Sequence, residues 1–252
     1  SLLQRFKEVG VAGDVRSNNI SVIDRAEVPG GRFSPSLSRN LAIGLLVGLM
    51  LGVLIAFVLE FLDDTLKTPE DVEQRLKLAV LGIIPRLVKQ TPEQAVMDLR
   101  SAFSESYRSV RTALQFSTDQ GVPKVLLVTS ASPGEGKSTT ALALARNFAQ
   151  MGKRVLLVEA DLRNPSLQKS LKMRAEVGLS NLLAGAHTLA EAVLDTDEPL
   201  LKVILAGPLP PNPAELLSGS KLVSVLTIAS QHYDQVLIDG PPVMGIADAP
   251  IL

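Results

Sequence analysis

The chain has no cysteine and no tryptophan, and it has only two tyrosines in 252 residues. The absence of cysteine excludes disulfide scaffolds, cysteine-ligated zinc sites and cysteine nucleophiles. A charge excess is also absent, because 25 basic and 26 acidic residues give a formal net charge of −1. A nucleic-acid-binding surface requires a clear basic excess, so we expect no nucleic acid among the partners.

One stretch lacks charge altogether. Residues 41–59 read LAIGLLVGLMLGVLIAFVL, and as a helix this run spans roughly 28 Å, close to the ~30 Å hydrocarbon core of a bilayer. A buried core helix is the alternative, but such helices are seldom so long and so uniformly apolar. We therefore predict a transmembrane helix over 41–62. Gly44, Gly48 and Gly52 share one face of it, which favours close helix packing, although glycine is common in membrane helices in general.

The segment before this helix is polar and carries no signal-peptide pattern. It predicts an amphipathic stretch at Leu2–Val9, a short strand around Ile20–Ile23 and a Pro- and Gly-rich loop before the membrane. Basic residues flank the helix on both sides, so the positive-inside rule gives no orientation. Because the chain starts with serine and ends just after an apolar strand, we interpret it as a fragment of a longer protein.

The segment after this helix starts with a capping signal, Thr68-Pro69-Glu70-Asp71, which predicts a helix to about Leu78. We expect a short strand at 79–85, a polar linker at 86–97 and a helix from Met97 to Phe116. From Lys124 onward, short apolar runs alternate with stretches of helical length; the runs are KVLLVTS, RVLLVEA, LKVILAG and DQVLIDG. Strands apolar on both faces predict an α/β fold with a doubly wound, mainly parallel sheet.

A phosphate-binding motif follows the first of these runs. Residues 131–138 read A-x-x-x-x-G-K-S, the Walker A pattern with alanine in place of the first glycine. The glycines let successive backbone N–H groups point at phosphate oxygens, the lysine reaches the β- and γ-phosphates, and the serine hydroxyl ligates Mg²⁺. We therefore predict ATP and Mg²⁺ as ligands, with ATP contacts from Ser132, Pro133, Gly134, Glu135, Gly136, Lys137, Ser138 and Thr139.

Three acids stand at the ends of two later strands. Glu159 and Asp161 follow one apolar run and Asp239 ends another, in the manner of a Walker B carboxylate. In an open parallel sheet the ligand crevice lies at the carboxyl ends of the strands, so all three acids are expected to face the phosphates. A single acid after a strand is most often a turn or a helix cap, but several at neighbouring strand ends favour function. Lys137, Glu159, Asp161 and Asp239 are thus the candidate catalytic residues, with Ser138, Asp161 and Asp239 as metal ligands.

The motifs SPGEGKST, VLLVEADLR and VLIDGPP together resemble those of the bacterial tyrosine kinases, the BY-kinase family of polysaccharide co-polymerases. Related MinD/ParA-type ATPases carry an additional lysine where this chain has Ser132, which favours the kinase branch. In the family the first acid of the second motif is usually Asp, so Glu159 departs from the pattern while Asp161 matches it. The resemblance implies transfer of the ATP γ-phosphate to tyrosine hydroxyls, with Asp161 orienting the acceptor.

The resemblance extends along the chain. Residues 1–40 resemble the end of a Wzz-type extracytoplasmic α+β domain, and PLPPNPAELLSG resembles a family loop near the site. Glu105, Arg108 and Arg111 show the E-x-x-R-x-x-R spacing that in the family joins kinase domains into a homo-oligomeric ring; a solvated helix face is the alternative. The implied parts are the end of that domain (1–40), the membrane helix (41–62), a juxtamembrane segment and linker (63–97), and a P-loop kinase domain truncated at its C-terminus (98–252).

The resemblance also implies partners and location. They are the bacterial inner membrane with the kinase domain on its cytoplasmic side, the polysaccharide polymerisation and export machinery, and acceptor tyrosines in a C-terminal tail of the same or a neighbouring subunit. Such a tyrosine cluster is missing here, since the chain has only Tyr107 and Tyr233. Two other functions stay open: an ATPase switch of the MinD/ParA type, and a non-catalytic organiser of polysaccharide chain length.

Overall fold

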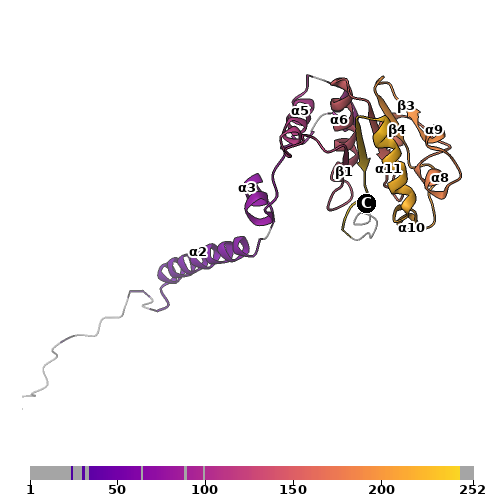
Figure 1. The fold of residues 1–252 in the computed structure, drawn as a ribbon. Coiled ribbons are helices and arrows are strands. Elements are labelled where there is room, and N and C mark those ends of the chain that lie inside the picture. The colour runs from indigo at the N-terminus through magenta and orange to yellow at the C-terminus, as the bar shows by residue number, and fades with distance from the viewer. Residues whose placement is uncertain are drawn as a thin grey trace, which may run out of the picture. The chain divides into compact units, whose positions relative to one another are not determined.

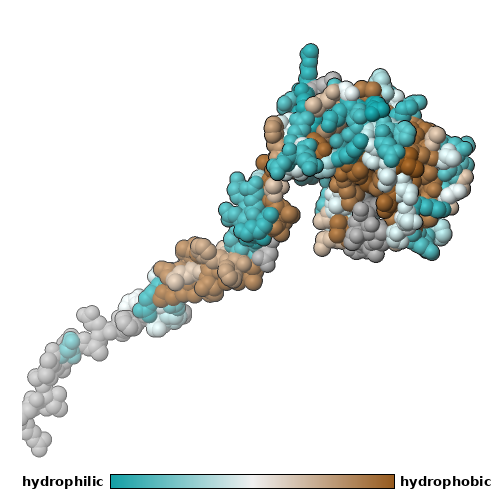
Figure 2. Space-filling view, in the orientation of Figure 1, coloured by the Kyte–Doolittle hydropathy of each residue, from teal (hydrophilic) through white to brown (hydrophobic). Residues whose placement is uncertain are grey.

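The computed structural model describes residues 24, 30–31, 34–63, 65–87, 90–98 and 100–244, and the chain divides into two units after Lys67. The first unit contains helix α2 (Leu37–Phe61), in which no residue is buried. An 18-residue stretch of it has a mean hydropathy of 2.9, and its 25 residues are long enough to cross a membrane. The face of the helix seen in Figure 2 is apolar along most of its length, with polar residues at one end. The predicted apolar helix is confirmed, with four more residues at its start than the uncharged run.

The second unit is built on a five-stranded sheet with the order β1-β5-β2-β4-β3. Figure 1 shows β1 and β3 towards opposite sides of this unit. Neighbouring strands are parallel except β3, which runs antiparallel to β4 at the edge. The four strands predicted from the apolar runs are confirmed, whereas β3 has only two residues and no recognisable pattern. The strands are β1 (Val125–Val128), β2 (Val155–Glu159), β3 (Leu194–Asp195), β4 (Leu201–Ile204) and β5 (Gln235–Asp239).

Helices cover both faces of this sheet, as its apolar strands require. Along β2, Val155 and Leu157 join the core under α5 and α6, whereas Leu156 and Val158 join the core under α8, α10 and α11. Two cores on opposite faces of one mainly parallel sheet confirm the predicted doubly wound α/β class. The helices are α5 (Ala102–Gln115), α6 (Lys137–Gln150), α7 (Leu167–Leu171), α8 (Leu179–Ala184), α9 (Leu189–Ala192), α10 (Pro213–Leu217) and α11 (Ser220–His232).

The segment before the sheet differs from the prediction in three places. The run at 79–85 forms no strand, because it lies beside no strand with which it can pair; Gly82 instead approaches Val110 of α5 so closely that an added Cβ would lie 2.6 Å from Cγ2. The expected linker contains a helix, α4 (Pro92–Met97), started by a capping box at Thr91. Helix α5 begins only at Ala102, since the Ser101 side chain caps it by accepting from the Ser104 amide.

The other predictions for this region have mixed outcomes. The capping box at Thr68 and Asp71 is present and opens α3 (Pro69–Asp71), which continues as the π-helical turn η1 (Val72–Leu76), two residues short of the predicted end. The stretches predicted at Leu2–Val9 and Ile20–Ile23 lie outside the described residues.

Candidate nucleotide-binding site

The phosphate-binding loop joins β1 to α6. Gly134 and Gly136 have φ angles of 84° and 89°, a left-handed backbone conformation that residues with a Cβ atom rarely adopt. Gly136 is the N-cap of α6, so the helix starts at Lys137. The amides of the first helical turn are therefore directed at the space above the loop, which makes this helix end suited to bind an anion.

Side chains within and next to the loop hold its shape. The Glu135 carboxylate accepts a hydrogen bond from the Ala131 amide at 3.0 Å, and the Ser130 hydroxyl donates to the Ser132 carbonyl at 2.8 Å. The Thr129 hydroxyl donates to the carbonyl of Pro241 at 2.6 Å. The loop is thus fixed both internally and to the segment that follows β5. Sequence reasoning missed the contact with Pro241, because it joins residues 112 apart in the chain.

Lys137 and Asp161 form an ion pair at the centre of the site. Their Nζ and Oδ2 atoms lie 2.8 Å apart, and the side chains are only 10% and 4% exposed. The other oxygen of Asp161 accepts from the backbone amides of Arg163 and Asn164, which fixes the carboxylate in place. The lysine is also 3.4 Å from the Ser138 hydroxyl. The structure therefore brings together the lysine, the serine and the acid that the motifs predicted.

Glu159 is buried at the end of β2 but has different partners. One of its oxygens accepts from the Leu167 amide at 2.7 Å and the other from the Ala206 amide at 3.0 Å. Burial raises the pKa of Glu159, and these amide hydrogen bonds oppose the rise. With both oxygens engaged by the backbone, Glu159 connects β2 to the start of α7 and to the exit of β4.

Asp239 is the opposite case. It is fully buried, and neither of its oxygens has a hydrogen bond of normal geometry to a described residue, although the Ser138 hydroxyl lies close enough to lower its pKa. Burial raises its pKa to about 6, although the Ser138 hydroxyl and the Lys137 charge lower it. No cluster of three or more His, Asp and Glu side chains in the described part of the chain is arranged to hold a metal ion by itself. An unpartnered carboxylate next to a serine hydroxyl nevertheless fits Mg²⁺, which commonly binds one or two carboxylates together with phosphate oxygens.

The predicted assembly residues lie on α5, away from the motifs at the strand ends. Glu105 and Arg108 form an ion pair at 3.1 Å on the exposed side of the helix. The buried side carries Phe103, Ser104, Tyr107 and Val110. The helix therefore has one polar face and one face packed into the core under α6.

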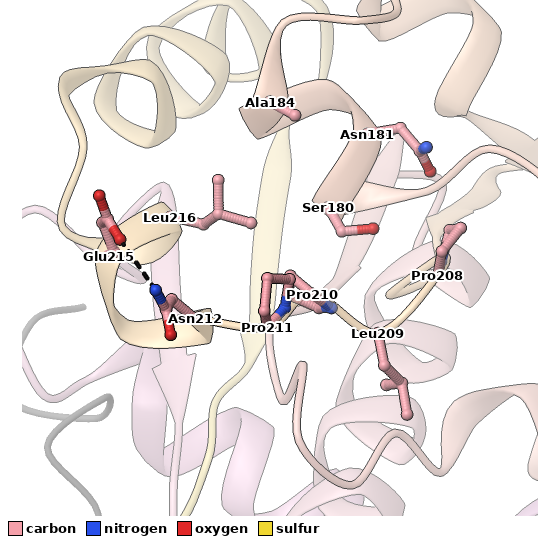
Figure 3. Close-up of a pocket in the computed structure, with 10 residues that line it drawn as sticks. All are labelled: Ser180, Asn181, Ala184, Pro208, Leu209, Pro210, Pro211, Asn212, Glu215 and Leu216. Atoms are coloured by element: carbon pink, nitrogen blue, oxygen red, sulfur yellow. Dashed lines mark hydrogen bonds between the residues drawn. The ribbon is translucent and has the colours of Figure 1, made fainter.

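A cavity of about 570 Å³ opens where β4 ends, at the same edge of the sheet as the phosphate-binding loop. Its walls come from the proline-rich loop 208–212 and from α8 and α10 (Figure 3). Ser180 is only 6% exposed, and its hydroxyl has no hydrogen-bond partner in the part of the chain that the structure describes. The loop follows directly after Ala206, whose amide is bound by Glu159. The family-like PLPPNPAELLSG segment thus forms a concave surface connected to the acidic strand end.

Comparison with known families gives two matches. Residues 123–252 match the family described as "AAA domain", and residues 1–61 match the family described as "G-rich domain on putative tyrosine kinase". The first match covers the sheet from β1 onward and contains the phosphate-binding loop and all three acids. It supports nucleotide binding at this site.

Tyrosine kinases are among the known proteins similar to the chain. YwqD of Bacillus subtilis is 44% identical over 158 residues, covering 63% of this chain and 67% of YwqD. Etk of Escherichia coli is 29% identical over 273 residues, covering 100% of this chain but only 38% of Etk. The chain therefore spans little more than a third of the longer relatives.

Solved structures agree with these sequence matches. The kinase domain of Escherichia coli ETK superposes with a TM-score of 0.68 at 30% identity, covering 74% of this chain and 78% of that domain. The chimerical protein CapA2B2 gives a TM-score of 0.67 at 34% identity, with 73% and 80% covered. With the loop geometry and the family matches, these likenesses show that the chain belongs to the bacterial tyrosine kinases with a P-loop domain of the AAA type.

Proposed function

We propose that this chain binds Mg-ATP and transfers the γ-phosphate to tyrosine hydroxyls of its own or a neighbouring subunit's tail. The observation that carries this proposal is the buried Lys137–Asp161 pair beside the unpartnered Asp239. Phosphoryl transfer asks the protein mainly to position the reactants and to neutralise charge. Lys137 is a buried cation, Asp239 is an acid suited to Mg²⁺, and the first turn of α6 provides amides. Together these groups can position the phosphates and neutralise their charge.

The residues divide into roles as follows. Lys137 and the first turn of α6 hold the phosphates, and Ser138, Asp161 and Asp239 hold the metal ion, which neutralises phosphate charge when bound. Asp161 is already fixed by two backbone amides, so it is suited to orient the acceptor hydroxyl. Glu159 acts as a brace that keeps the strand ends in register. The segment with the acceptor tyrosine lies over this edge of the sheet, beside the proline-walled cavity.

Membrane anchoring and assembly complete the proposal. Helix α2 is apolar enough to span a bilayer, and ATP is a cytoplasmic ligand, so the kinase unit faces the cytoplasm of a bacterial cell. Glu105, Arg108 and Arg111 join kinase units into a ring. In the cell the partner is the machinery that polymerises and exports polysaccharide.

The test is a phosphotyrosine blot of the full-length protein incubated with Mg-ATP, next to its Lys137→Met variant. We expect signal in the unaltered protein and none in the variant. Lys202→Met is the matched control, because Lys202 pairs with Asp195 on the surface of the antiparallel edge; it retains the signal. Phosphate release without phosphotyrosine in the unaltered protein would contradict the kinase and support an ATPase switch.

A further inference from the structure

Tyr107 forms a polar connection between α5 and α6. Its hydroxyl lies 3.0 Å from the Thr140 Oγ1 atom. The residue is only 2% exposed, and its ring packs edge-on against Phe103, with the centroids 5.0 Å apart and the planes at 75°. Burial raises the pKa of the Tyr107 phenol, so the hydroxyl is neutral at physiological pH. The contact is therefore a hydrogen bond of a neutral hydroxyl at the edge of the core, where it is part-buried.

Thr140 belongs to the turn that presents the phosphate-binding groups. Its amide donates to the Gly136 carbonyl at 2.9 Å, which closes the first turn of α6. Lys137 and Ser138 lie within that same turn. Because a helical turn moves as a unit, a bond that holds the Thr140 side chain also limits rotation of the lysine and the serine.

Few other groups fill the space beside this bond. A cavity of about 380 Å³ separates the start of α6 from the segment before α5, and Phe103, Tyr107, Gly136, Thr139 and Thr140 contribute to its lining. Close packing normally holds a helix end in place. Where packing is incomplete, a single part-buried hydrogen bond contributes a larger share of the positioning.

The opposite face of α5 carries the Glu105–Arg108 ion pair. One helix thus presents charged residues to its surroundings and a tyrosine hydroxyl to the nucleotide loop. A shift of α5 caused by a contact on its outer face would reach Thr140 through Tyr107.

We propose that Tyr107 is a positioning residue of the nucleotide site, which couples α5 to the phosphate-binding turn through Thr140. The inference rests on the proposed nucleotide-binding function but does not require phosphoryl transfer. Tyr107 is not itself an acceptor, since its hydroxyl is buried and bonded.

The experiment measures the affinity of the full chain in detergent micelles for Mg-ADP, by isothermal titration, together with its thermal unfolding midpoint. Tyr107→Phe keeps the ring and removes only the hydroxyl. A net hydrogen bond is worth about 0.5–1.5 kcal/mol, so we expect the dissociation constant to rise roughly three- to tenfold. Thr140→Val has the same effect, the double variant loses little more than either single one, and Thr140→Ser, which keeps a hydroxyl, binds like the unaltered protein.

The chain supplies its own control. Tyr233 is half-buried in the other core, and its hydroxyl has no hydrogen bond to any described residue. Tyr233→Phe should leave Mg-ADP affinity unchanged. Unchanged affinity in Tyr107→Phe, even with a lower unfolding midpoint, would overturn the inference, because the bond would then serve stability alone. Additive losses in the double variant would also overturn it. A protein that binds Mg-ADP with this coupling but forms no phosphotyrosine would refute the proposed kinase and leave the coupling supported.

Discussion

The ends of β2 and β5 carry acids at the same register position, with Glu159 opposite Asp239. Both side chains are fully buried, yet their surroundings differ completely. Glu159 accepts backbone amides on both oxygens, whereas Asp239 accepts none. Burying a polar group without a partner is costly. Glu159 therefore stabilises the fold, whereas the neighbouring Asp239 is available to a ligand.

This difference separates stability from activity within one pair of strands. An acid saturated by the backbone contributes to folding, and its removal leaves buried amides without acceptors. An acid without partners costs stability until a positive group arrives, and a Mg²⁺ ion supplies that charge. Four experiments test whether one acid serves stability and the other serves activity, from the largest expected effect to the smallest.

The largest effect is expected from Asp239→Asn on phosphoryl transfer. The variant keeps the shape of the side chain but removes the charge that we assign to the metal ion. We expect autophosphorylation to fall on the order of a thousandfold, measured by radiolabelled phosphate transfer, because charge stabilisation dominates such reactions. Asp234→Asn is the matched control, since Asp234 pairs with Arg154 on the surface. Comparable losses in both variants would contradict the assigned role.

Glu159→Gln is predicted to act on stability. The amide of glutamine would place an N–H group against the amide of Leu167 or Ala206, where the carboxylate now accepts. We expect the free energy of unfolding to fall by about 2–4 kcal/mol, measured by urea denaturation. Glu176→Gln, at an exposed position, is the control. A stable variant with no activity would instead make Glu159 a catalytic group.

The pH dependence of stability tests whether the Asp239 carboxyl is desolvated. The Asp239 pKa of about 6 lies above its value of about 3.8 in the unfolded chain, so the folded protein retains a proton that the unfolded chain releases. Without Mg²⁺, this group therefore reduces stability as pH rises from about 4 to 6, by roughly 3 kcal/mol in total. Urea denaturation at pH 4.5 and pH 7.5 should show this slope in the unaltered protein and its loss in Asp239→Asn. Equal slopes in both proteins would show that the carboxyl is not desolvated.

Local sequence patterns predict the phosphate-binding loop and the strands of this site. The glycines and the lysine of residues 134–137 determine the loop and the helix start by their own backbone preferences, and β2 and β5 follow from apolar runs. The partners of Glu159 could not be predicted in this way, because Ala206 lies 47 residues further along the chain. No local pattern distinguishes an acid that will accept two distant amides from one that will face a metal ion.

Helix α4 and the run at 79–85 differ from the prediction for different reasons. Helix α4 was predictable, since Thr91-Pro92-Glu93-Gln94 is a capping box with proline at the first turn, and the polar composition of the segment concealed it. The apolar run at 79–85 was not predictable from its pattern. Ile84, with Leu87 beyond the run, packs against the core, whereas Leu81 and Ile83 are exposed, so the apolar composition of the run does not reflect a strand buried in a sheet.

The smallest effect is expected at Glu135, an exposed acid that sharpens the contrast with the buried pair. Its carboxylate accepts the Ala131 amide, and glutamine can still accept through its carbonyl oxygen, so Glu135→Gln keeps the loop brace while removing a negative charge beside the proposed phosphates. We expect Mg-ATP to bind about two- to threefold more tightly in the variant at low salt. Because solvent and ions screen exposed charges, the gain should disappear near 0.5 M salt. Glu135→Ala, which also loses the hydrogen bond to the Ala131 amide, should bind Mg-ATP more weakly than Glu135→Gln under both conditions. If Glu135→Gln instead binds Mg-ATP more weakly than the unaltered protein, the carboxylate contacts the ligand or the metal directly.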